Sequence, residues 1–106
     1  MTTFDKREKD FERKFALDEE VKFKSEARRN RLLGLWAAEK LGLSGDAAKT
    51  YAGEIVAADC EGGAAGVARK VTGDLAACGI TIPDEQLRDK MAQLLVLAAA
   101  QVQAGK

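Results

Sequence analysis

Three phenylalanines near the start of the chain have the most distinctive spacing in the sequence. Phe4, Phe11 and Phe15 lie at positions i, i+7 and i+11, which places them on one face of a helix. A helix with so few large apolar residues among so many charges is marginal in isolation. We expect this segment to be partly disordered in the free protein and to become ordered when a groove covers the phenylalanines. Docking of the three rings onto the chain's own core is the alternative.

Charge is concentrated in the same part of the chain. Residues 1–31 contain ten Lys and Arg and eight Asp and Glu, whereas the whole chain has 17 of each and a formal net charge of zero. Because the two signs nearly cancel, nucleic-acid binding is not expected, since it requires a positive excess. The longest apolar run, 94–100, is far too short for a membrane-spanning helix, and we see no signal peptide. We expect a cytoplasmic protein without membrane insertion.

Residue types that perform catalysis or bind metals are scarce. The chain has no His, and Cys60 and Cys78 lack the spacing of a zinc site, so we expect no metal and two buried thiols. The sequence GDAAKT at 45–50 lacks the first glycine of a phosphate-binding loop and follows no predicted strand. No nucleophile is paired with a base. The sequence therefore predicts neither an enzyme nor a bound cofactor.

Arg28, Arg29 and Arg31 form a basic cluster. One interpretation is a weak phosphate or carboxylate site, for example for an adenine nucleotide, in a small helical binding module. The interpretation we favour is a solvated helix face with ordinary ion pairs. A third hypothesis is an oligomerisation module, in which the phenylalanine face pairs with a second copy.

The pattern of helix-forming residues predicts an all-α protein. With 106 residues and one Pro, the chain is expected to form one compact unit preceded by a long or extended N-terminal helical segment. The expected domains are 1–18, the N-terminal segment, and 19–106, a four-helix bundle with Trp36 as a core anchor. The expected helices of the bundle span about 19–41, 44–60, 64–78 and 83–102, with Gly42, the run 61–63 and Gly79 as helix ends.

The first third also contains a dense motif. It consists of Phe4, Arg7, Glu8, Phe11, Glu12, Lys14 and Phe15, followed by Asp18, Phe23-Lys24, Ala27-Arg28-Arg29-Asn30 and Leu32-Leu33-Gly34-Leu35-Trp36-Ala37-Ala38. The match resumes at Arg69-Lys70-Val71 and Gly73-Asp74-Leu75. This motif resembles the zeta subunit family of bacterial F1Fo-ATP synthases, whose members are inhibitors of the F1-ATPase.

The resemblance implies a mode of action. The N-terminal segment would become helical in a cleft between catalytic and non-catalytic F1 subunits and would block rotation of the central stalk in the direction of ATP hydrolysis. The residues that match the inhibitory motif, and that we expect to bind the partner, are Phe4, Arg7, Glu8, Phe11, Glu12, Lys14 and Phe15. The resemblance also implies association with the membrane-attached ATP synthase and, for some members, weak adenine-nucleotide binding.

Overall fold

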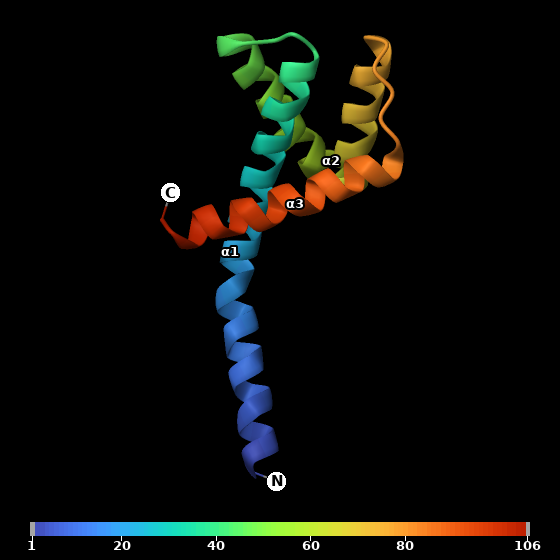
Figure 1. Cartoon of the computed structure of the whole chain (residues 1–106). Helices are drawn as coiled ribbons and strands as arrows, with labels where there is room; N and C mark the ends of the chain where they lie inside the picture. The colour runs from blue at the N-terminus through green and yellow to red at the C-terminus, as the bar shows by residue number, and fades with distance from the viewer. Residues whose placement is uncertain (1, 106) are drawn as a thin grey trace.

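The computed structural model describes the backbone of residues 2–105 and the side chains of residues 19–105. Over this range the chain forms three helices, α1 (Thr2–Lys40), α2 (Gly45–Ala77) and α3 (Asp84–Gln103) (Figure 1). The prediction of an all-α protein is confirmed.

Helix α1 is long because nothing in its sequence interrupts it: the first Gly is Gly34, and the surrounding residues are good helix formers. Its end is set by Gly42, as predicted. Gly42 has φ 80° and donates its N–H to the carbonyl of Glu39 at 3.1 Å, while the N–H of Leu43 bonds the carbonyl of Ala38 at 2.8 Å. This is the Schellman arrangement that closes a helix through a left-handed residue.

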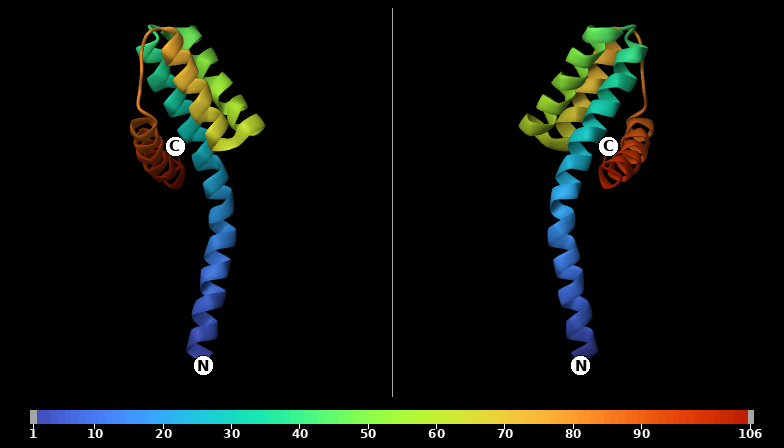
Figure 2. Two further views of the ribbon diagram at one scale, coloured as in Figure 1. Left: turned by 90° about the vertical axis from the view of Figure 1, so that its right-hand side faces the viewer. Right: turned by 90° about the vertical axis from the view of Figure 1, so that its left-hand side faces the viewer.

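The four-helix bundle is not confirmed, since the described residues form three helices. The predicted break at 61–63 lies inside α2, where Gly63 has non-helical angles of φ 66° and ψ −163°. At this residue the chain folds back, so that α2 consists of two arms, 45–62 and 64–77, which lie side by side (Figure 2). A single residue is enough for this reversal because Gly adopts a backbone region that other residues avoid.

The arrangement of α3 also differs from an antiparallel bundle. It runs across α1 rather than along it, and it packs mainly on α1 and only slightly on α2 (Figure 1). The first half of α1 extends away from the other helices in all views, and the molecule measures 59 × 27 × 22 Å along its principal axes (Figures 1 and 2).

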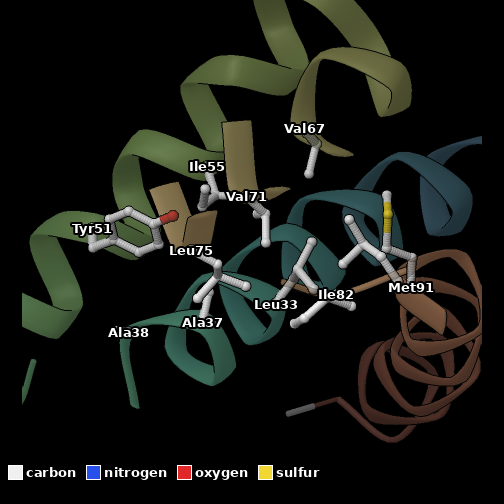
Figure 3. Close-up of a cluster of buried hydrophobic side chains, with 11 residues drawn as sticks. Leu33, Ala37, Ala38, Tyr51, Ile55, Val67, Val71, Leu75, Ile82 and Met91 are labelled. Carbon is white, nitrogen blue, oxygen red and sulfur yellow. The ribbon is translucent and has the colours of Figure 1, made fainter. Parts of the chain in front are cut away.

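The core lies where α1, both arms of α2 and the start of α3 meet. Figure 3 shows its side chains pointing toward one another from these elements. Its members are Leu33, Ala37, Ala38, Tyr51, Ile55, Val67, Val71, Leu75, Ile82, Leu87 and Met91. Trp36, the expected anchor, is only half-buried at the edge, where the Nζ atoms of Lys40 and Lys90 lie 5.0 and 5.6 Å from the centre of its ring. The close contact between α1 and α2 is made instead by small residues, Gly34 and Ala52.

Candidate functional site

The predicted partner-binding residues lie on the free half of α1. Their side chains lie outside the described residues, so their contacts, and the expected disorder of residues 1–18 in the free protein, stay predictions. These residues are Phe4, Arg7, Glu8, Phe11, Glu12, Lys14 and Phe15. The described backbone places all of them on one helix that continues without a break into the core-forming residues of α1.

The basic cluster does not form one site. Arg28 and Arg31 lie on the side of α1 that faces the 45–62 arm of α2 and line a groove of about 280 Å³ there. Arg29 lines a different depression of about 420 Å³, between the bend of α2 and helix α3. Positions i and i+3 share a helix face, whereas position i+1 is rotated by about 100°. The separation of Arg29 from the other two follows from this geometry.

The side chain of Arg29 is buried, so the expectation that the basic cluster lies on a solvated helix face is wrong for this residue. Its side chain is only 8% exposed, and its Nε donates to Oδ1 of Asn30 at 3.1 Å. Among the described side chains, no carboxylate forms an ion pair with Arg29. Asn30 is fully buried, and its Nδ2 has no hydrogen-bond partner within the described part of the chain. Ser25 is also buried, and its hydroxyl donates to the carbonyl of Val21 at 2.6 Å. Ser25, Arg29 and Asn30 are thus three buried polar residues on α1 that the sequence did not predict.

Arg31 also borders a further depression, beside the 280 Å³ groove that it lines with Arg28. It is lined by Arg31, Leu35, Lys49, Ala52 and Gly53 and has a volume of about 270 Å³. The 280 Å³ groove is lined by Phe23, Lys24, Ala27, Arg28, Arg31 and Val56. We call these two depressions, which share Arg31, the α1–α2 groove. Sequence reasoning did not identify Lys49 or Val56 as neighbours of α1, because only the packing of α2 brings them there.

A polar cluster connects the two arms of α2. The Tyr51 hydroxyl donates to Oδ2 of Asp74 at 2.8 Å, and Nζ of Lys70 lies 3.2 Å from the same oxygen. Lys70 also lies 5.5 Å from the centre of the Tyr51 ring. Burial, and then the hydrogen bond to Asp74, raise the pKa of Tyr51 well above its usual range. This hydroxyl is therefore held neutral, as a structural donor.

The two cysteines are free and both are exposed, which contradicts the expected buried thiols. Cys60 precedes the bend of α2 and Cys78 caps its end, and neither place is covered by another helix. No cluster of potential metal ligands occurs among the described residues. Over the same range, none of the helices combines the length and hydrophobicity that crossing a membrane requires.

Comparison with known proteins identifies the family. No curated protein sequence gave a significant match. The family model described as ATPase inhibitor subunit zeta matches residues 1–101, which covers nearly the whole chain, including the phenylalanine segment, α2 and almost all of α3. The chain therefore belongs to the ATPase inhibitor subunit zeta family.

Proposed function

We propose that this protein inhibits the F1-ATPase by inserting residues 2–18 of α1, as a helix, between catalytic and non-catalytic F1 subunits. There the inserted helix blocks rotation of the central stalk in the direction of ATP hydrolysis. Residues 19–106 form the domain that stays outside the cleft. The protein acts in the cytoplasm, on the membrane-attached synthase, and needs no cofactor of its own.

The course of α1 is the observation that carries this proposal. Its first half extends away from the other helices, so its backbone is accessible to a partner from several sides (Figures 1 and 2). Among the residues whose side chains the structure describes, the hydrophobic core cluster is formed between Leu33 and Met91. We infer that residues 2–18 contribute little to the stability of the fold and that their phenylalanines serve binding.

The energies involved are consistent with insertion. Full burial of one Phe side chain is worth about 1.5–3 kcal/mol. Three such residues together are worth about 4.5–9 kcal/mol, which can exceed the roughly 2–5 kcal/mol required to order a segment on binding. The charges of Arg7, Glu8, Glu12 and Lys14 then set register and orientation rather than supplying most of the affinity.

The alternative of an adenine-nucleotide site receives less support. It rested on Arg28, Arg29 or Arg31 near a helix junction, and the three do not converge on one depression, because Arg29 lines a different one from the other two.

The test is a hydrolysis assay with the F1-ATPase of the same bacterium. The full chain is expected to lower the rate of ATP hydrolysis, and a version that starts at Glu19 is expected to leave it unchanged. Both versions should have the same melting temperature, because the buried residues of α1 among the described side chains, from Ser25 onward, are present in both. Equal inhibition by the two versions would contradict the proposal.

A further inference from the structure

The α1–α2 groove combines positive charge with exposed apolar surface. Its lining includes four cationic side chains, those of Lys24, Arg28, Arg31 and Lys49, and among the described residues that line it none is acidic. This is a local excess in a chain whose formal net charge is zero. Such a concentration of one sign attracts a partner of the opposite sign.

The individual cations differ in how far they are already neutralised. The Nζ atom of Lys24 lies 3.1 Å from a carboxylate oxygen of Glu20, and Arg28 already has an interaction partner. Arg31 and Lys49 have no ion pair among the described side chains, and both are exposed. These two residues are therefore the cations that are available to carboxylates of a partner.

Apolar side chains lie beside these charges. Phe23 is 74% exposed and Leu35 is 38% exposed, while Val56 is partly buried beneath the groove. Large apolar side chains flanked by cations are typical of protein interfaces, in which aromatic residues and Arg are enriched. Phe23 also lies only five residues after the inhibitory segment, on the same helix.

The shape of the groove favours an extended partner over a compact anion. The cations Lys24 and Arg31 are seven residues apart on α1, which corresponds to about 10 Å along the helix. A phosphate group contacts cations within a few ångströms of one another. Carboxylates placed along a protein segment match the spread of the cations from Lys24 to Arg31 and Lys49.

We propose that the α1–α2 groove binds an acidic segment of F1 that carries at least one apolar side chain, next to the cleft that receives residues 2–18. This inference rests on the proposed function and extends it, since it gives the inhibitor a second contact outside the cleft. The carboxylates of the partner pair with Arg31 and Lys49, and its apolar side chain covers Phe23 and Val56. This second contact positions the domain of residues 19–106 on F1 and raises the rate at which the inhibitor associates with F1.

The test uses the full chain and two matched double variants. Arg31→Glu/Lys49→Glu reverses the two available cations of the groove. Lys22→Glu/Arg69→Glu makes the same change in charge elsewhere: Lys22 lies two and a half turns before Arg31, on the opposite face of α1, and Arg69 lies on the second arm of α2. All four residues are exposed, so both variants should retain the fold, which circular dichroism and melting temperature verify.

Binding to immobilised F1 and inhibition of hydrolysis are both measured. The groove variant is expected to have a dissociation constant raised by about tenfold or more, mainly through slower association, because electrostatic steering changes association rates by 10- to 1,000-fold. The control variant is expected to stay within about twofold of the wild type. Inhibition at saturating concentration should remain complete for both. Raising the salt concentration should weaken binding of the wild type more than that of the groove variant.

Two further arms separate this proposal from the proposed function and from another occupant. The two groove substitutions are also introduced into Phe11→Ala/Phe15→Ala, where residual binding to F1 should fall again if the groove is a separate contact. Equal dissociation constants for the groove and control variants would overturn the groove proposal and leave insertion of residues 2–18 intact. Groove-dependent binding to phosphatidylserine vesicles with no groove effect on F1 would also overturn it, in favour of a lipid surface. Groove-dependent binding to F1 without any inhibition would support the groove and refute the proposed function.

Discussion

Gly34 of α1 lies directly against Ala52 of α2. A Cβ atom added to Gly34 would come to 2.5 Å from the Cα of Ala52, 3.0 Å from its Cβ and 3.2 Å from Cγ1 of Ile55. The first of these atoms belongs to the backbone, so no change of rotamer can relieve the contact. The two helices therefore pack as closely as they do only because position 34 has no side chain.

Gly34→Ala is expected to destabilise the protein. Forcing α1 and α2 apart costs about 1–3 kcal/mol, which exceeds the gain of up to ~1 kcal/mol from replacing a helical Gly by Ala. The matched control is Gly73→Ala, because a Cβ at that helical glycine would meet no atom within 4 Å. Urea unfolding should show a lower free energy of unfolding for the first variant and an equal or higher one for the second. Stabilisation by both would show that the helices do not approach closely at Gly34.

The bend of α2 provides a second matched pair. Gly63 has φ 66° and ψ −163°, a backbone region that is essentially restricted to Gly, so Gly63→Ala should cost about 1–3 kcal/mol. At Gly62 the nearest atom to an added Cβ is Nη2 of Arg69 at 3.7 Å, an ordinary contact, and φ is not positive there. Gly62→Ala should therefore leave the free energy of unfolding nearly unchanged. Equal melting temperatures for the two variants would argue against the sharp reversal at residue 63.

The hydrogen bond between Tyr51 and Asp74 predicts a pH dependence. The pKa of Tyr51 is raised in the folded protein, so the unfolded chain loses this proton at a lower pH than the folded chain does. The stabilisation from the hydroxyl is therefore complete below about pH 10 and is lost as the pH rises above that value. Tyr51→Phe should lower the free energy of unfolding by ~1 kcal/mol at neutral pH. Lys70 remains as a partner of Asp74, which keeps this carboxylate paired.

The measurement is urea unfolding of wild type and Tyr51→Phe at several pH values. Taking the difference between the two proteins removes the titration of lysines and cysteines, which both share. This difference should shrink as the pH rises from about 10 toward 11. A difference that stays constant over that range would mean that Tyr51 is not held neutral by its surroundings.

Local sequence signals predicted the helices well but predicted their arrangement poorly. Gly42 and Gly79 mark helix ends that depend only on neighbouring residues, and both have φ 80° with the expected backbone hydrogen bonds. The bend at 61–63 was also predicted, but its sharpness depends on one dihedral pair at Gly63. The path of α3 across α1 depends on side-chain packing between distant segments, which no local pattern encodes.

The candidate site shows the same division. Arg28 and Arg31 share a face because of helical periodicity, and that part is readable from sequence. Burial of Arg29 and Asn30 is not readable, because polar residues on a charged helix are normally solvated. Lys49 reaches the groove only through the contact between α1 and α2, which in turn depends on the missing side chain at Gly34.

Phe11→Ala combined with Phe15→Ala tests the proposed function within the full chain. Removing two of the three phenylalanines forfeits roughly 3–6 kcal/mol of apolar burial in the cleft, which corresponds to a loss of affinity of a hundredfold or more. Inhibition of F1 hydrolysis should therefore disappear at concentrations at which the wild type inhibits fully. The melting temperature should hardly change if, as we propose, the two rings serve the F1 cleft, because the core cluster of the described side chains lies between Leu33 and Met91. Sedimentation at several concentrations, run on both proteins, distinguishes a phenylalanine face that binds F1 from one that pairs with a second copy. Undiminished inhibition by the double variant would show that the phenylalanine face is not what the F1 cleft receives.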